Sequence, residues 1–279
     1  MRVSEQSTKL RSSELNTYLE RGYHFPIRVL DDSEVADFRK HFESYRDYYS
    51  DRLNSLPPSK HGSIYAHTHM FLGWVYRMAT YPNVLDAVES VFGPNLLLWD
   101  SGWFAKMPGD QKFVSWHQDA TYFGLHPPKV ITAWIALSES IPDNGCLRVI
   151  PESHKNPILP HLETFGPQNA LSRGQEIAAE VDEQQAVDIV LHPGEMSLHD
   201  VALIHGSKAN TSDQPRIGIA LRYVPTEVVQ DGDVRQFALL ARGKDEFGHF
   251  DLIDPPQSDD PGNNAMQIES LDRIARNKL

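Results

Sequence analysis

After Gly93 the chain consists of short segments rich in β-branched and aromatic residues, and turn-forming Gly, Pro, Asn or Asp residues separate each from the next. Segments of this length and spacing are typical of an antiparallel β-sandwich or barrel. The sequence therefore predicts a mainly β core. The expected strands lie in NLLLWDSGWFAKM, KFVSWHQDATYF, KVITAWIALSES, GCLRVIPES, AVDIVLHPGEMSLHD, ALIHGS and RIGIALRYVP.

The part of the chain before Gly93 has a helical pattern instead. SSELNTYLERGYHFPI predicts a helix that ends at Gly22 and is followed by a short apolar strand. DDSEVADFRKHFESYRDYYSDRL combines acidic residues at its start with apolar residues at helical spacing. HMFLGWVYRMATYPNVLDAVESVFG predicts two helical segments divided by Pro82.

No internal repeat and no long linker divides the sequence, so we expect a single domain over residues 1–279. Its helical part covers about 1–93, its β core about 94–225, and a C-terminal extension 226–279 ends in a loop-like tail from Gly248. Residues 154–184 form a polar, irregular insertion of a length that is usually functional in compact domains. We expect this insertion, with residues 65–69, to form a mobile cover over the site.

The charge and the cysteine content exclude several classes of protein. With 38 acidic against 26 basic residues the net charge is −12, which argues against binding to nucleic acid or to an anionic membrane surface. Cys146 is the single cysteine, so the chain has no internal disulfide and no cysteine-based zinc site. The N-terminus has no apolar leader and no segment reaches the length of a membrane span, so a cytoplasmic location is expected.

Histidine precedes aspartate by two residues at His117–Asp119 and at His249–Asp251. With 13 histidines and Asp at ~6% of residues, about one such pair arises by chance, so the spacing alone decides nothing. His117 and Asp119 lie in an expected strand, where residues i and i+2 share a face and can bind one ion. His249 and Asp251 follow Gly248 without a strand pattern and are interpreted as a solvated turn.

A third histidine pair, His67 and His69, stands without a carboxylate or another histidine near it in the sequence. Two imidazoles on one face can bind zinc, but two protein ligands rarely hold a divalent ion. Packing or contact with a substrate is therefore the favoured interpretation of this pair.

A metal ion held by His117 and Asp119 needs a further ligand, and two histidines and a carboxylate are diagnostic of non-haem Fe(II) oxygenases. The candidates are His199 and His205. We favour His205, because an apolar VALI run leads into it and Arg216 begins the next strand after a turn. His199 is expected at a strand end, paired or solvated.

On the strand that begins at Arg216, four residues share one face: Arg216, Gly218, Ala220 and Arg222. Two small residues between two arginines leave room for a ligand. The planar guanidinium group suits a carboxylate, because it can donate two parallel hydrogen bonds. The strand thus predicts a binding site for an acid close to the metal.

The order of these motifs closely resembles the phytanoyl-CoA dioxygenase (PhyH-like) family of Fe(II)/2-oxoglutarate oxygenases. The resemblance runs from about Leu15 to Pro225. It rests on WHQD, on TAWIALSES followed by DNGCLRVIPESHK, and on LHDVALIHGSKANTSDQPRIGIALRYVP. It implies a double-stranded β-helix, a cupin-like jelly roll with helices packed outside, in agreement with the expected strands.

The resemblance also assigns the cofactors and the site. It implies that His117, Asp119 and His205 bind Fe(II) and act as the catalytic centre, and that Arg216 binds the far carboxylate of 2-oxoglutarate. Ser207 and Trp134 match positions that assist or line that cosubstrate site. O2 is then the second cosubstrate, and ascorbate is expected to help turnover in vitro.

The substrate is expected to be a small polar metabolite such as an amino-acid derivative, a phosphonate or a natural-product intermediate. The reason is that the segments HQDATYFGLHPP and TAWIALSES most resemble bacterial enzymes that act on such compounds. Five residues are candidates for the substrate pocket: Trp103, Lys106, Tyr122, Arg222 and His67. For Trp103 and Tyr122, core packing is an equal alternative.

Two other functions stay open. A hydroxylase of acyl-CoA substrates in the same family would favour a basic rim for nucleotide phosphates, which the net charge of −12 makes less favourable. A metal-binding jelly roll without turnover has no need of an arginine that binds an oxoacid.

Since halogenating relatives replace the metal-binding carboxylate by a small residue, Asp119 predicts hydroxylation or a related oxidation. The oligomeric state is left open.

Overall fold

The computed structural model describes residues 7–53, 62–166, 168–171, 173–260 and 262, and these residues are the basis of everything that follows. Helices dominate the part before Gly93, as the sequence predicts. Gly22 ends the first helix in the left-handed conformation, at φ 82°. Pro82 begins a new helix at its first position, where proline needs no hydrogen-bond partner. The helices are α1 (Ser12–Arg21), α2 (Asp32–Leu53), α3 (Gly73–Ala79), α4 (Pro82–Phe92) and the short α5 (Ala120–Phe123), with 3₁₀ turns at Gly62–Tyr65, Thr68–Met70, Pro142–Asn144, Ser153–Lys155 and Glu183–Gln185.

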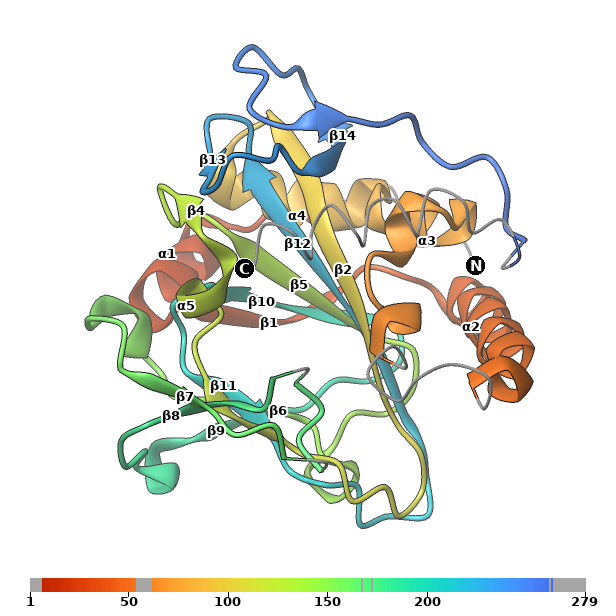
Figure 1. Ribbon diagram of the computed structural model, residues 1–279, viewed down its shortest axis with the longest axis vertical. Coiled ribbons are helices and arrows are strands. Elements are labelled where there is room, and N and C mark those ends of the chain that lie inside the picture. The colour runs from red at the N-terminus through yellow and green to blue at the C-terminus, as the bar shows by residue number, and fades with distance from the viewer. Residues whose placement is uncertain (1–6, 54–61, 167, 172, 261, 263–279) are drawn as a thin grey trace.

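A seven-stranded sheet crosses the middle of the molecule in the order β1-β10-β5-β12-β2-β14-β15 (Figure 1). Neighbouring strands of this sheet are antiparallel, except for β14 and β15, which are parallel to each other. Its strands are β1 (Tyr23–Arg28), β10 (Glu195–Asp200), β5 (Ile131–Ala136), β12 (Arg216–Pro225), β2 (Leu96–Lys106), β14 (Phe237–Arg242) and β15 (Asp251–Leu252).

A four-stranded antiparallel sheet, in the order β3-β11-β6-β9, lies against one face of the large sheet. Its strands are β3 (Val114–His117), β11 (His205–Ser207), β6 (Leu147–Val149) and β9 (Val187–Ile189). Two small two-stranded sheets complete the strands: β4 (Leu125–His126) pairs with β13 (Val229–Gln230), and β7 (His161–Glu163) forms a hairpin with β8 (Gln175–Ile177). The two facing sheets form the jelly roll that the sequence predicts.

The two faces of the large sheet have different roles. Alternate residues of β12 such as Ile217 and Leu221 pack against the helices, in a core that also contains Phe42 of α2 and Trp74 of α3. This core and the helices α2, α3 and α4 lie on the outer side of the sheet (Figure 1). The residues between them, including Ala220, face the small sheet. One face of the large sheet is thus sealed by helices, and the other is available for a site.

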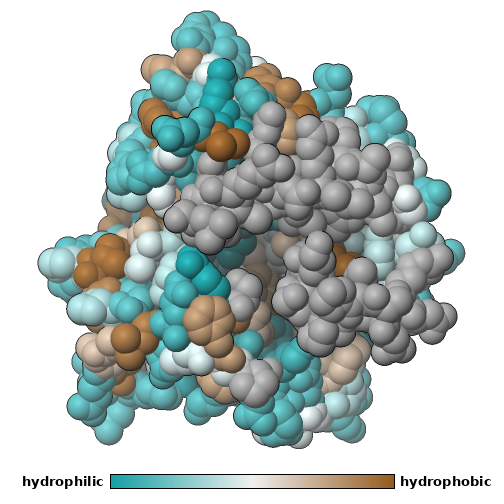
Figure 2. Space-filling view, viewed as in Figure 1, coloured by the Kyte–Doolittle hydropathy of each residue, from teal (hydrophilic) through white to brown (hydrophobic). Residues whose placement is uncertain are grey.

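The segments on either side of the predicted β core also join the large sheet. β1, from the helical N-terminal part, pairs with β10, and β14, from the C-terminal extension, pairs with β2. Among the described residues, no helix is long and apolar enough to cross a membrane. On the face shown in Figure 2 polar residues predominate, and apolar residues stand in small separate groups.

Candidate metal centre

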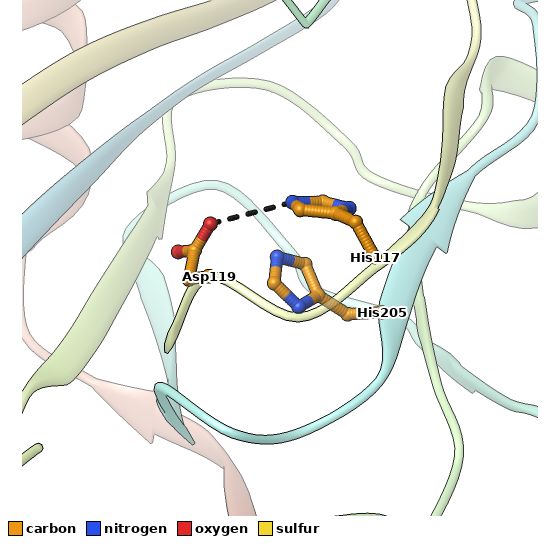
Figure 3. A group of neighbouring side chains, drawn as sticks. All are labelled: His117, Asp119 and His205. Carbon is orange, nitrogen blue, oxygen red and sulfur yellow. Dashed lines mark ion pairs between the residues drawn. The ribbon is translucent and has the colours of Figure 1, made fainter. Parts of the chain in front are cut away.

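Three side chains of the inner face converge at one end of the sheets: His117, Asp119 and His205. One nitrogen or oxygen atom from each lies within 4.8 Å of the others, and all three residues are buried (Figure 3). His117 Nε2 lies 3.4 Å from Asp119 Oδ1. Two imidazoles and one carboxylate are the ligand set that suits a non-haem iron site. In the part of the chain that the structure describes, this is the one group with the ligand spacing of a metal site.

Strand pairing brings the two histidines together. β11 lies antiparallel to β3 with His205 directly opposite His117, and their ring centroids are 4.1 Å apart. Neighbouring strands lie about 4.8 Å apart, so opposite residues on one face bring their side chains into contact. The pairing of these neighbouring strands supports the prediction that His205 is the further ligand.

The route by which Asp119 reaches the same point differs from the predicted one. β3 ends at His117, and Asp119 lies at the start of α5 with helical φ −57° and ψ −34°. The alternation of a strand therefore does not place it beside His117, and that part of the prediction is wrong. A turn does so instead: the Gln118 side chain donates to Ala202 O and accepts from Leu159 N. Gln118 faces away from the site, as expected, and anchors the turn.

Hydrogen bonds to backbone carbonyls set the tautomers of both histidines. Nδ1 of His117 lies 2.9 Å from Ser115 O, and Nδ1 of His205 lies 2.9 Å from Leu203 O. A carbonyl only accepts, so Nδ1 carries the proton and Nε2 keeps a free lone pair. Burial, with His117 nearby, holds the pKa of His205 well below its usual value, which favours the neutral ligand form.

The carboxylate of Asp119 is kept ionised. Burial acts to raise its pKa, but the charge of Arg222 holds that pKa well below its usual range. Asp119 is therefore an anion next to two imidazoles that each offer Nε2, and a divalent cation fits this donor set.

A cavity of about 420 Å³ of open space, part of it continuous with solvent, extends from the two histidines along the inner face of the large sheet. Eight residues singled out from the sequence line it: His117, His199, His205, Ser207, Arg216, Trp134, Ala220 and Arg222. Five further residues complete the lining: Phe104, Val114, Thr132, Leu147 and Gly206.

Arg216 stands at the end of the cavity away from the metal ligands. Its Nη1 donates to Gly145 O at 2.5 Å, its guanidinium carbon lies 5.5 Å from the Trp134 ring centroid, and its buried Nε has no partner. A buried donor without a partner is costly, and a carboxylate would satisfy it. A Cβ on Gly218 would lie 2.2 Å from Cζ2 of Trp134, so glycine is needed for the ring to lie here.

Lys106 lies at the same end, not at the metal. Its Nζ donates to Ser207 Oγ at 2.7 Å and to Lys208 O. Burial and the neighbouring charge of Arg216 lower the pKa of Lys106 to about 6. Arg216, Lys106 and Ser207 therefore form a cluster of donors suited to one end of an acid.

Of the other candidates for the substrate pocket, His67 and Arg222 meet at the same carboxylate, that of Asp100. His67 Nδ1 is 2.8 Å from Asp100, and Arg222 pairs with Asp100 and Asp119. Trp103 packs in the helix-side core and does not line the cavity, which agrees with the alternative of core packing. Tyr122 stands edge-on to His161 at 5.5 Å, beside the insertion.

The insertion 154–184 is more ordered than the sequence suggests. It contains the β7–β8 hairpin, and Ser115 of β3 donates to Gln175 O of that hairpin. His161 of β7 accepts a hydrogen bond from the backbone N–H of Gln118 at 3.0 Å. The hairpin is thus attached directly to the turn that carries Asp119.

Sequence reasoning misjudged His199. It lies on β10, but it is buried, its ring centroid is 4.9 Å from that of His205, and its Nδ1 has no partner. The expectation of a paired or solvated residue is wrong, because β10 pairs on both sides and places this residue in the cavity wall. Burial lowers its pKa to about 4. Thr132, its partner on β5, also lines the cavity with an unpartnered hydroxyl.

The second His-x-Asp pair lies elsewhere. Asp251 begins strand β15 and forms an ion pair of 3.3 Å with Arg235, so the interpretation of this pair as a solvated turn is wrong for Asp251. Neither His249 nor Asp251 belongs to the metal-type cluster among the described residues. The preference for His117–Asp119 over His249–Asp251 agrees with this placement.

Comparisons with known proteins show which family the chain resembles. The family model for phytanoyl-CoA dioxygenase matches residues 18–218. The peroxisomal phytanoyl-CoA dioxygenase of Bos taurus is 28% identical over 228 residues, which cover 74% of this chain and 66% of that protein. The methylphosphonate hydroxylase of Gimesia maris is 25% identical over 236 residues, covering 82% of this chain and 85% of that protein.

A solved structure shows the same fold over nearly the whole chain. The apo form of the non-heme monooxygenase ThoJ has a TM-score of 0.82 at 28% identity, covering 94% of this chain and 96% of that one. Its nickel complex has a TM-score of 0.76 at 26% identity. The chain spans 45% to 66% of the length of the phytanoyl-CoA dioxygenases that it matches first.

Proposed function

The chain belongs to the phytanoyl-CoA dioxygenase family, and on that premise we propose that it is an Fe(II)/2-oxoglutarate-dependent dioxygenase that hydroxylates a small polar metabolite. The observation that carries this proposal is the pairing of two features in one cavity. His117 and His205, which group with Asp119, line one end, and Arg216, whose buried Nε has no partner, lies at the other.

The donor set fits ferrous iron. Each histidine presents Nε2 to the centre of the group, because its Nδ1 is committed to a carbonyl. His117, Asp119 and His205 would hold the ion from one side and would leave positions for other ligands. When bound, iron supplies the activation of O2 that couples oxidation of a substrate C–H bond to decarboxylation of 2-oxoglutarate. Ascorbate is expected to support turnover by keeping the iron ferrous.

The end of the cavity away from the metal ligands offers the side chains that would bind 2-oxoglutarate. Arg216 and Ser207 offer donors to the carboxylate of 2-oxoglutarate that is remote from the metal, and Trp134 fixes the plane of the guanidinium. Lys106 lies in this cluster, so we propose that it contacts the cosubstrate and not the substrate. The low pKa of Lys106 means that a bound dianion can draw a proton onto its amine.

The reaction type follows from Asp119. Its buried carboxylate is an anion, so it holds a ligand position of the metal and opposes entry of a halide into the same place. We propose hydroxylation or a related oxidation on this ground. A halogenated product from the wild-type protein in saturating chloride or bromide would contradict it.

The substrate class is inferred from the net charge and from one relative. The net charge of −12 disfavours a nucleotide-bearing acyl-CoA, and the match to a methylphosphonate hydroxylase extends over most of both chains. We also propose that the chain acts as one catalytic domain, because β1 and β14 join the same large sheet from either side of the β core.

The test is release of succinate from 2-oxoglutarate with Fe(II) and ascorbate, across a panel of amino acids, aminophosphonates, small acids and acyl-CoA thioesters. Stimulation above the rate without substrate by one of the small polar compounds supports the proposal. Stimulation by acyl-CoA alone would shift the substrate class, and no succinate under any condition would favour a binding protein without turnover.

A further inference from the structure

A row of largely buried polar side chains begins at Asp119 and continues through Arg222 of the cavity wall to Asp100 and His67. Asp119 Oδ2 lies 3.4 Å from Arg222 Nε, and Arg222 Nη1 lies 2.8 Å from Asp100 Oδ2. Asp100 Oδ1 in turn lies 2.8 Å from His67 Nδ1. The four side chains are between 7% and 14% exposed and come from four different segments of the chain.

The two oxygens of Asp119 face different partners. Oδ1 is the oxygen that lies 3.4 Å from His117 Nε2, while Oδ2 is directed to Arg222. Figure 3 shows the second oxygen pointing away from both imidazole rings. A carboxylate whose two oxygens are both free can bind a metal through one or through both of them. Here one of the two is already occupied by a cation.

Arg222 is itself held on several sides. Arg222 donates a hydrogen bond from Nη1 to Asp100, and the ring centroid of Phe123 lies 5.2 Å from its guanidinium carbon. The two carboxylates raise the pKa of Arg222 above its usual value although burial alone would lower it. Asp100 is supported by His67, whose backbone adopts φ 54°, a conformation that costs energy for a residue other than glycine. The guanidinium therefore has little freedom to turn towards a substrate.

We infer that Arg222 is a positioning residue: it holds Oδ2 of Asp119 so that the metal ion meets Oδ1 alone, and Asp100 with His67 holds Arg222 in place. The inference rests on the proposed function. A carboxylate that bound through both oxygens would fill one more coordination position, and that position is needed by 2-oxoglutarate or O2. Arg222 thus acts on cosubstrate binding through Asp119, without touching the cosubstrate.

A role in stability alone does not account for this arrangement. A buried arginine between two carboxylates is weak evidence for net stabilisation, because removing these charges from water costs several kcal/mol per ion. Another arginine between two carboxylates serves for comparison: Arg242 Nη1 lies 2.8 Å from Asp86 and 2.6 Å from Glu89, and none of these three residues lines the cavity. It is the matched control.

The test uses cobalt(II), which binds the same kinds of ligand and has a visible absorption that reports the number and arrangement of its ligands. Wild type, Arg222→Gln, Arg222→Lys, Asp100→Asn and the control Arg242→Gln are each titrated with cobalt(II) without oxygen. Calorimetry then gives the affinity of each cobalt-loaded protein for 2-oxoglutarate.

In Arg222→Gln we expect cobalt(II) to bind at least as tightly as in wild type, with an altered visible spectrum. We expect 2-oxoglutarate to bind roughly 10-fold or more weakly. Arg222→Lys should restore part of that loss, because the charge remains and the fixed geometry does not. Asp100→Asn should show a smaller change of the same kind, and Arg242→Gln should match wild type in both affinities and in the spectrum.

The inference is overturned if Arg222→Gln leaves the spectrum and the 2-oxoglutarate affinity unchanged, or if it weakens cobalt(II) binding and leaves 2-oxoglutarate binding intact. If Arg222→Gln does not fold, Arg222→Lys and Asp100→Asn decide by the same two readouts. Failure of the proposed function looks different: the wild type itself would then bind neither cobalt(II) nor 2-oxoglutarate.

Discussion

Replacing Arg216 by lysine tests the cosubstrate site most sharply. The change keeps the positive charge and removes the planar pair of donors. In the structure one donor of Arg216 is used by Gly145 O at 2.5 Å, and the buried Nε has no partner. A lysine ammonium can keep the contact to Gly145 or reach a carboxylate in the cavity, but it cannot reproduce both.

The size of the effect follows from the donors lost. One hydrogen bond to a charged group contributes about 1.5–3 kcal/mol, and each 1.4 kcal/mol changes an equilibrium about tenfold. Arg216→Lys should therefore raise the KM for 2-oxoglutarate roughly 10- to 150-fold while the melting temperature changes little. The surface variant Arg235→Lys, far from the cavity lining, should leave that KM unchanged.

Succinate formation at a series of 2-oxoglutarate concentrations provides the assay, with circular dichroism as a check of folding. A well-folded Arg216→Lys protein with an unchanged KM would refute the role of Arg216. The structure does not offer Arg222 as a simple replacement, because that side chain is already paired with Asp100 and Asp119.

Three further predictions follow from the same cavity. The pKa of Lys106 is lowered to about 6, and a bound dianion would stabilise its charged form. Binding of 2-oxoglutarate near pH 7.5 should therefore take up a proton, and the affinity should fall as the pH rises. Calorimetry in two buffers of different ionisation enthalpy should show this proton uptake in wild type and not in Lys106→Met. Gly218→Ala should destabilise the fold by about 1–3 kcal/mol and raise the KM for 2-oxoglutarate, because the added Cβ would lie 2.2 Å from the Trp134 ring. In urea unfolding the control Gly166→Ala should behave as wild type, because its Cβ would have no contact closer than 3.9 Å. Equal losses of stability in the two variants would contradict the argument. Proteolysis within 154–184 should slow when metal, 2-oxoglutarate and substrate are bound; a rate insensitive to all of them would mark this insertion as an uninvolved surface loop.

Much of the site could be predicted because strand pairing is regular. Once His117 and His205 lie on neighbouring antiparallel strands, their contact follows, and the alternation of β12 places Arg216 and Arg222 on the inner face. The position of Asp119 was predicted for the wrong reason. It depends on contacts of Gln118 with Ala202 and Leu159, which lie far away in the sequence.

Trp103 shows why the rest of the pocket could not be predicted. The pairing of β2 with β12 shifts by one residue between Arg222 and Tyr223, opposite Trp99. A one-residue shift reverses which side chains face inward from that point on. Trp103 consequently packs against the helices, and its neighbour Phe104 lines the cavity. No local pattern in NLLLWDSGWFAKM marks the shift.

Asp100 and His199 were missed for a related reason. A charged residue within an apolar strand, such as Asp100 in LLLWDSGW, indicates an oppositely charged or hydrogen-bonding partner in the folded protein, but the sequence does not identify that partner. Its identity as Arg222 depends on the register of β2 with β12. His199 is buried because β10 has neighbours on both sides, one of which, β1, comes from the helical N-terminal part.

The central claim is that His117, Asp119 and His205 form the single iron site, and the most direct measurement is an oxygen-free titration with Fe(II) of wild type and two alanine variants. We predict one Fe(II) per chain in wild type and in His249→Ala, and loss of that binding in a folded His205→Ala protein. Retention of a full equivalent of Fe(II) by His205→Ala, or its loss in His249→Ala, would contradict the account.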